Sequence, residues 1–249
     1  MKRFICLCIG CVLWMSTHAQ NKNVKYDEQL WSQLNTRFRL TEKWYIHFDA
    51  GFRMHKGYVQ DVSQYFLRPG LMYQPSKKVQ VFGGYAYFST SQWINGYEDV
   101  FRPEHRYWNF ITIRENFNRF EIRHRYRLEA RWQQKIKSGE LIDGYDFFWR
   151  FGYQLQCNVA LNHKKITDNT LFLIVSDELM INAGKTIENY FDQNRLAGGL
   201  GYQFNDTWRL TATYQYVYGK QPRGTQATSA QLLWWTLFVN LDLRNKDKE

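Results

Sequence analysis

From about Leu30 to Leu243 the sequence repeats one pattern, in which runs of about ten residues alternate apolar or aromatic side chains with polar ones and end at turns. The clearest run covers residues 120–132, FEIRHRYRLEARW. Its even positions are apolar or aromatic apart from His124, and its odd positions are all Arg or Glu. Since successive side chains of a β-strand point to opposite faces, this run predicts a strand with one apolar and one charged face.

Two all-β architectures can accommodate such strands. A soluble sandwich buries the apolar faces against a second sheet, whereas a membrane barrel turns them toward lipid and keeps the polar faces in its lumen. The mean hydropathy of −0.57 does not exclude a membrane protein. In a barrel, apolar residues that face lipid alternate with polar residues that face the lumen, and this keeps the average hydropathy low. We expect an all-β fold, an antiparallel transmembrane β-barrel.

The first twenty residues have the features of a secretory signal peptide: a basic start at Lys2 and Arg3, an apolar stretch, and a small-residue cleavage site ending at Ala19. The prediction is a signal peptide over residues 1–19 and an outer-membrane barrel domain over residues 20–249. A membrane anchor and a lipoprotein are the alternatives. Three of the four cysteines leave with this peptide, so Cys157 predicts neither a disulfide nor a cysteine metal site.

The remaining chain contains eleven candidate strands. They cover about 28–40, 44–53, 64–73, 79–88, 102–113, 120–132, 145–157, 170–182, 191–204, 208–218 and 230–243. Tight turns alternate with longer loops at 54–63, 89–101, 133–144, 183–190 and 219–229, as in bacterial barrels. Those barrels use even strand numbers. We therefore expect 10–12 strands and favour twelve, with an additional strand before residue 28; ten is the alternative.

Aromatic residues gather near the predicted strand ends, at Trp44 and Trp208 beside tight turns and at Phe52, Tyr65 and Tyr145 beside long loops. Girdles of aromatic residues at the two membrane interfaces have this distribution. Ordinary β-propensity of aromatic residues is the alternative explanation.

The inward positions of the middle strands are strongly charged. They carry Arg102, Glu104, Arg106, Arg123, Arg125, Arg127, Glu129, Arg131, Arg150, Glu178 and Arg195. Antiparallel pairing predicts that Arg102 and Glu104 lie near Arg127 and Glu129. It also predicts Arg150 opposite Glu178, and Glu178 near Arg195.

These charges allow two interpretations. Paired charges would form a structural plug that fills a small barrel, since unpaired buried charges are costly. Alternatively, the arginines form a constriction that selects small anions. Asp177 breaks the alternation, so we expect either that a bulge turns it inward or that it lies at the outer rim.

Several segments, in order along the chain, carry a resemblance to a known family. They are Arg102–Trp108 (RPEHRYW), Arg123–Arg131 (RHRYRLEAR), Ser176–Leu179 (SDEL), Asn189–Arg195 (NYFDQNR), Gly198–Gln203 (GGLGYQ) and Asn240–Arg244 (NLDLR). In these the chain resembles the bacterial outer-membrane proteins grouped as domain-of-unknown-function family 2490. The resemblance implies an outer-membrane β-barrel and no activity. It adds Asp192, Gln193 and Asn194 to the residues of interest. The chain departs from the family pattern at Asn109-Phe110 and in Gly219–Ser229.

No nucleophile, phosphate-loop, zinc or dinucleotide motif occurs, and we expect no enzyme activity, no metal and no cofactor. A lipid hydrolase is the alternative, in which His124 and Asn109 would lie across from each other on the outer face. The net charge of +10 derives from arginines within strands, so we expect no nucleic-acid partner. The expected partners are outer-membrane lipid and the barrel-assembly machinery. The expected role is a structural barrel or a narrow channel.

Overall fold

The computed structural model describes residues 24–92 and 97–244, and these form eleven strands of one closed barrel. All eleven predicted strands are confirmed, and the signal peptide prediction lies outside the described residues. The strands are β1 (Val24–Arg39), β2 (Trp44–His55), β3 (Asp61–Tyr73), β4 (Val79–Gln92), β5 (Tyr97–Phe117), β6 (Phe120–Lys137), β7 (Glu140–Ala160), β8 (Thr170–Ala183), β9 (Phe191–Gln203), β10 (Trp208–Lys220) and β11 (Ala227–Asp242). Among the described residues, no helix has the length and hydropathy of a membrane span.

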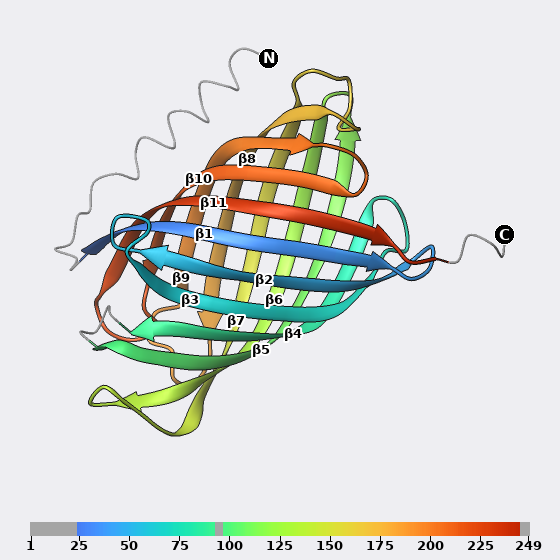
Figure 1. Cartoon of the computed structure of the whole chain (residues 1–249). Helices are drawn as coiled ribbons and strands as arrows, with labels where there is room; N and C mark the ends of the chain where they lie inside the picture. Colours follow the sequence, from blue (N-terminus) through green and yellow to red (C-terminus); the bar gives the residue numbers. More distant parts are fainter. Residues whose placement is uncertain (1–23, 93–96, 245–249) are drawn as a thin grey trace, which may run out of the picture.

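The barrel closes between its first and last strands. Neighbours along the chain pair antiparallel, whereas β1 and β11 pair in parallel from Val24↔Ala227 to Arg39↔Asp242. Strands that alternate in direction leave the first and the eleventh running the same way, as Figure 1 shows for β1 and β11. The preference for twelve strands is therefore wrong, since this closure leaves no gap in the wall. The residues before position 28 extend β1 instead.

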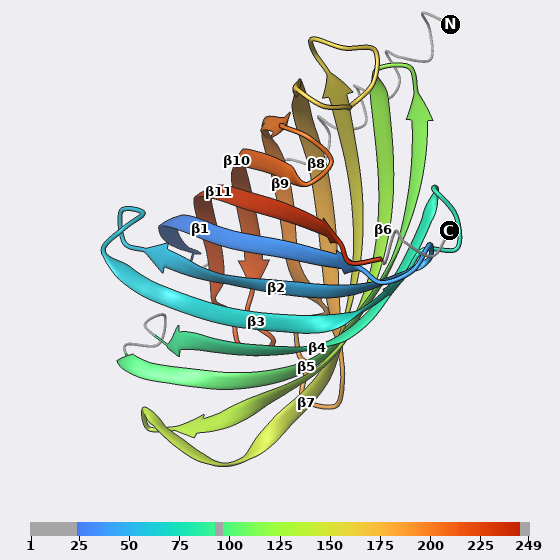
Figure 2. The same ribbon diagram turned by 45° about the vertical axis from the view of Figure 1, so that its right-hand side comes forward.

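The two ends of the barrel differ. One end, called here the short-turn end, carries the turns after β1, β3, β5, β7 and β9, and the other carries the remaining connections and is called the long-loop end. The prediction of a loop over residues 133–144 is wrong. There β6 and β7 continue as paired strands to Ser138 and Gly139, whose positive φ angles form a two-residue hairpin turn. This hairpin projects beyond its neighbours (Figure 2). It escaped prediction because both of its faces are partly polar.

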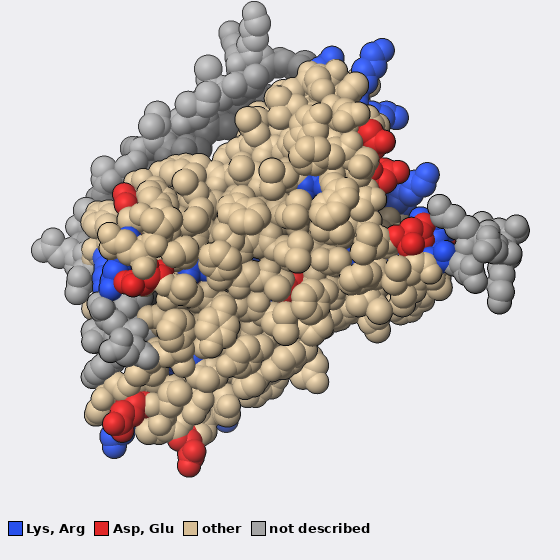
Figure 3. Space-filling model, viewed as in Figure 1, with Lys and Arg blue, Asp and Glu red and all other residues tan. Residues whose placement is uncertain are grey.

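The outer face of the wall is apolar. Along β8 every even-numbered side chain from Thr170 to Asn182 is buried, and every odd-numbered one from Leu171 to Ile181 is exposed. In Figure 3 a broad uncharged belt covers the visible side, and acidic and basic residues gather toward the ends. The exposed Asp177 is an exception at the middle of β8, where it accepts a hydrogen bond from Asn194 Nδ2 at 2.7 Å. Both alternatives predicted for Asp177 are wrong: it is not turned inward by a bulge, and it lies in the middle of β8 rather than at the outer rim.

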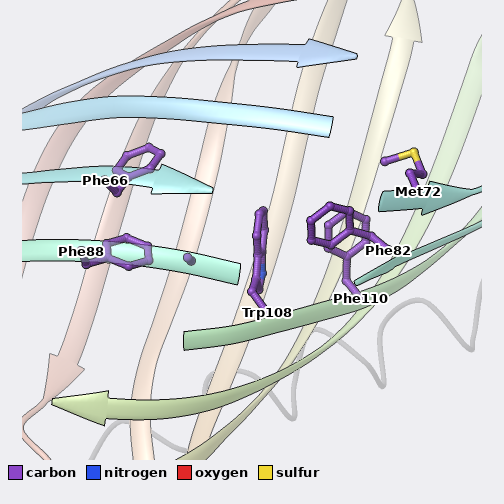
Figure 4. Close-up of a cluster of buried hydrophobic side chains, with 7 residues drawn as sticks. Phe66, Met72, Phe82, Phe88, Trp108 and Phe110 are labelled. Carbon is purple, nitrogen blue, oxygen red and sulfur yellow. The ribbon is translucent and has the colours of Figure 1, made fainter. Parts of the chain in front are cut away.

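Part of the inner face is also apolar, which alternation did not predict. Inward side chains of β3, β4 and β5 form a buried cluster, the inner aromatic cluster, shown in Figure 4. Its members are Phe66, Met72, Phe82, Ala86, Phe88, Trp108 and Phe110. Here both faces of the strands are apolar, so the sequence pattern does not reveal which face turns inward.

Glycines make room for the rings of this cluster. A Cβ atom on Gly70 would lie 2.6 Å from Phe82 Cε2, and one on Gly84 would lie 2.6 Å from Phe82 Cζ. A Cβ on Gly199 would meet the backbone of Ala212. Close packing therefore explains why glycine stands within a strand at positions 84 and 199.

Candidate functional site

The centre of the lumen contains a network of arginines and carboxylates from β5 to β9. Glu104 is its first node and is 2% exposed. Its Oε1 and Oε2 accept hydrogen bonds from Arg106 Nε and Nη2 at 2.7 and 3.0 Å. Arg131 Nη2 and Gln133 Nε2 each donate to Oε2 at 2.9 Å, and Arg131 Nε donates to Oε1. This carboxylate therefore holds two guanidinium groups from two strands.

Glu129 on β6 is the second node. Its Oε2 lies 3.1 Å from Arg106 Nη1 and 3.7 Å from Arg150 Nη1, and its Oε1 lies 3.6 Å from Arg127 Nη1. Arg106 thus bridges the two carboxylates Glu104 and Glu129. Because buried ion pairs are favourable only when their remaining bonds are satisfied, this sharing stabilises the network as a unit.

Glu178 and Asp192 complete the network on β8 and β9. Glu178 lies directly opposite Arg195 and 2.7 Å from Arg127 Nη2. The predicted proximity of Glu178 and Arg195 is confirmed, with Oε2 and Nη1 3.6 Å apart. Asp192 Oδ2 lies 2.8 Å from Arg150 Nη2, and its Oδ1 accepts a hydrogen bond from Asn182 Nδ2 at 2.9 Å.

A β-bulge explains the position of Asp192. The register of β8 with β9 shifts so that Met180 faces Gln193 while Ile181 faces Phe191. Asp192 is the additional residue, and both it and Gln193 reach the interior. Asn194, the third residue of the family motif, lies on the outer face with Asp177.

Two predicted registers are wrong. Glu104 lies opposite Gln133 rather than near Arg127 and Glu129, although Arg106 does reach Glu129. The β5–β6 turn is only two residues long, and this displaces the pairing toward later residues of β6.

The predicted pairing of Arg150 is displaced in the same way. Arg150 lies opposite Asn182 rather than Glu178. At the long-loop end, Arg102 is outside the network and lies 3.7 Å from Asp146.

Several lumen residues of β1, β2, β3, β5 and β10 were not predicted, because their charges are isolated rather than in charged runs. They are Arg37, Asp49, Arg53, Arg68, Arg114 and Arg209. Asp49 forms an ion pair with Arg68 and accepts a hydrogen bond from Gln33 Nε2 at 2.8 Å. The guanidinium group of Arg68 lies over the Trp108 ring at 4.2 Å, and that of Arg53 lies over the Trp31 ring at 3.5 Å.

Inside the barrel these residues surround a cavity of about 340 Å³. Among the described residues, thirteen arginines but only three carboxylates line it: Asp49, Glu104 and Glu129. Its volume is at the small end of the range of about 300–1,000 Å³ for ligand sites. The lumen is therefore narrow and basic.

The outer-face histidine is not part of this site. His124 lies opposite Ile113 on β5 and Leu155 on β7, and its Nδ1 is 2.9 Å from Tyr153 OH. Asn109 faces Leu128, four positions from the predicted partner. The geometry expected for the hydrolase alternative is thus not formed. In the part of the chain that the structure describes, no three His, Cys, Asp or Glu side chains form a metal-ligand group.

The fold and the site define a closed β-barrel with a buried network of arginines and carboxylates in its interior. The model of the family described as "Protein of unknown function (DUF2490)" matches residues 28–228. The chain belongs to this family, which confirms the resemblance found in the sequence. No curated protein and no solved structure matches the chain.

Proposed function

We propose that this chain is a bacterial outer-membrane β-barrel protein with a non-enzymatic role, as a structural barrel or a narrow channel. The observation that carries the proposal is the reversed polarity of the wall. Carboxylates such as Glu104 and Glu129 are buried inside, whereas Leu179 and Leu196 are 45% and 54% exposed outside. A wall of this kind is stable when hydrocarbon covers its outer face.

The aromatic residues support the same placement. At the short-turn end the rings of Trp44 and Tyr73 are 4.7 Å apart, and near the long-loop end those of Tyr65 and Phe101 are 5.7 Å apart. These rings would lie at the two interfaces. The short-turn end then faces the periplasm, and residues 1–19 direct export as a signal peptide. Lipid and the barrel-assembly machinery are the partners that this proposal requires.

Detergent dependence tests the placement. The mature chain should stay monodisperse only in detergent, and its folded form should migrate differently on gels before and after heating. In planar bilayers, a barrel whose lumen is closed by the network should produce no measurable ionic conductance. A mature chain that stays monodisperse in plain buffer would contradict the membrane placement.

The excess of arginines over carboxylates in the cavity wall favours a second candidate, a narrow anion-selective channel. Discrete conductance steps, with a reversal potential in a salt gradient that indicates chloride preference, would support it. Arg125→Gln should reduce this preference, because Arg125 lines the cavity and forms no ion pair with a carboxylate of the described chain. Arg119→Gln, in the β5–β6 turn, is the control. An unchanged selectivity in Arg125→Gln would contradict this candidate.

A further inference from the structure

Five arginines gather in the lumen toward the short-turn end, and they are called here the arginine cluster. They come from β1, β5, β6 and β10 and all line the cavity: Arg37, Arg114, Arg123, Arg125 and Arg209. Electrostatic repulsion acts on Arg37 from each of the other four. Arg114 and Arg123 are directly opposite each other on neighbouring strands, an arrangement in which like charges destabilise a sheet.

Carboxylates balance this cluster only in part. Glu121 forms an ion pair with Arg123 and also attracts Arg114 and Arg209, and Glu178 attracts Arg125 without forming an ion pair with it. Arg114 and Arg209 donate to the neutral side chains of Gln80 and Gln203. For Arg37 and Arg125, no ion pair or hydrogen bond with a described residue is formed. The Nε atoms of Arg37, Arg114, Arg123 and Arg125 are buried without a hydrogen-bond partner. Those of Arg127, Arg150 and Arg195 in the central network are too, so the missing ion pairs of Arg37 and Arg125, rather than these atoms, distinguish the cluster.

Neutral polar groups beside the arginines are also unsatisfied. His47, 2% exposed, lies directly opposite Arg37, and neither of its ring nitrogens has a hydrogen-bond partner. Thr112, also 2% exposed, lies directly opposite Arg125, and its hydroxyl has no partner. Both residues line the cavity. Buried polar groups are normally satisfied by protein, ordered water or a ligand, so several unsatisfied ones around one space indicate that a polar occupant fills it.

Aromatic rings line one side of the arginine cluster. Arg125 lies over the ring of Phe110 at 5.1 Å, and Phe110 stacks on Phe82 with ring centroids 4.7 Å apart (Figure 4). His47 contacts Phe82 edge-on, with ring centroids 5.1 Å apart. The inner aromatic cluster thus forms one side of a site whose other sides present guanidinium groups.

We propose that the arginine cluster is a binding site for a small soluble oxyanion of the phosphate or pyrophosphate type. Guanidinium groups bind such oxyanions through paired, charge-assisted hydrogen bonds. A multiply charged anion would remove the repulsion between Arg114 and Arg123 and accept from Arg37 and Arg125. A phosphate on a lipid headgroup has the same chemistry, but the cluster faces the lumen rather than the outer face.

The proposal is tested by binding to the full mature chain in detergent. The unfolding temperature is measured with inorganic phosphate, with pyrophosphate, with short-chain phosphatidic acid, and with sodium chloride at matched ionic strength. We expect pyrophosphate and phosphate to raise the unfolding temperature, pyrophosphate more strongly, and calorimetry to give saturable binding. An effect equal to that of sodium chloride, or an effect of phosphatidic acid alone, would overturn the proposal.

Two variants with one matched control locate the site. Arg37→Gln and Arg125→Gln should each weaken pyrophosphate binding about tenfold or more, the loss expected for one charge-assisted interaction. Arg39→Gln is the control, because Arg39 is two residues from Arg37 on β1 and pairs with Glu42 outside the cavity lining. Without ligand, both test variants should unfold at or above the wild-type temperature, because each loses one of several like charges. A cooperative unfolding transition at that temperature demonstrates that the variant is folded. Equal pyrophosphate affinity in the test variants and the control would also overturn the proposal.

The unfolding temperature and the binding affinity are both measured without a conductance experiment. Failure of this binding site and failure of the proposed channel are therefore distinguishable.

Discussion

The arginines of the lumen form two groups, which differ in how many carboxylates they contact. In the central network, each of Arg106, Arg127 and Arg150 contacts two carboxylates. In the arginine cluster, Arg114 and Arg123 lie opposite each other on neighbouring strands, and Arg37 forms no ion pair with a described residue. The charges of the first group are compensated inside the protein, whereas those of the second are compensated only in part, by Glu121, and the proposed oxyanion would supply the rest. The comparison separates charges that maintain the barrel from charges that remain available to a ligand.

The largest effect is expected at the first node of the network. Glu104→Gln leaves Arg106 and Arg131 buried without their common carboxylate, and we expect the free energy of unfolding to fall by about 3–5 kcal/mol. Denaturant unfolding in detergent, followed by tryptophan fluorescence, measures it. Glu42→Gln is the control, because Glu42 forms an exposed ion pair worth about 0–1 kcal/mol. If both variants lose the same free energy of unfolding, the buried ion pairs of Glu104 stabilise the barrel no more than an exposed pair does.

A smaller loss is expected at the bulge of β9. Asp192→Asn removes the charge that compensates Arg150 and should lower the free energy of unfolding by about 1.5–3 kcal/mol, the range for a hydrogen bond to a charged group. The same unfolding experiment measures it. Asp206→Asn, in the turn before β10, should change stability little. If the two variants behave alike, Asp192 is not part of the stabilising network.

The inner aromatic cluster contacts both the central network, through Arg106 over Phe88, and the arginine cluster, through Arg125 over Phe110. A variant that disturbs only the packing of these rings measures what packing contributes to stability apart from charge. Gly70→Ala would place a methyl group against the Phe82 ring and should cost about 1–3 kcal/mol. Gly198→Ala is the matched control, because a Cβ there meets nothing within 4 Å. Equal stabilities would mean that the ring moves aside easily.

The smallest effect has the opposite sign. Arg114→Gln removes one of two like charges on opposite strands and should raise the free energy of unfolding by about 0.2–1 kcal/mol in the absence of multiply charged anions. The gain should shrink as salt is added, since salt screens the repulsion. Arg119→Gln, in the β5–β6 turn, is the control. A loss of stability in Arg114→Gln would show that the cluster is compensated within the protein.

The sequence predicted all eleven strands because alternation is a local property of each run. Its failures have physical causes. The 133–144 hairpin and the inner face of β4 lack a polarity difference between their two faces. The observed eleven strands lie within the predicted range of 10–12, but the preference for twelve was wrong because closure depends on the parallel pairing of β1 with β11, two segments at opposite ends of the chain.

The predicted inward charges of the middle strands are placed inside, but their pairing is only partly as expected. Glu178 meets Arg195, whereas Glu104 and Arg150 each lie opposite a residue two pleat repeats beyond the nearer predicted partner. Pleat alternation specifies which face a side chain occupies and leaves the register between strands open.

By itself, the amino-acid order determined which side chains share a face of each strand, since the period of two is built into an extended backbone. On strands with one charged face it also determined which face turns inward. Which inward arginines are compensated was decided only by the closed barrel. Turn lengths, the bulge at Asp192 and the β1–β11 seam set the register, and a shift of two residues is enough to change a guanidinium group's partner. Electrostatic compensation inside a barrel is therefore a tertiary property, because it depends on distances between strands that the order of residues along one strand does not contain.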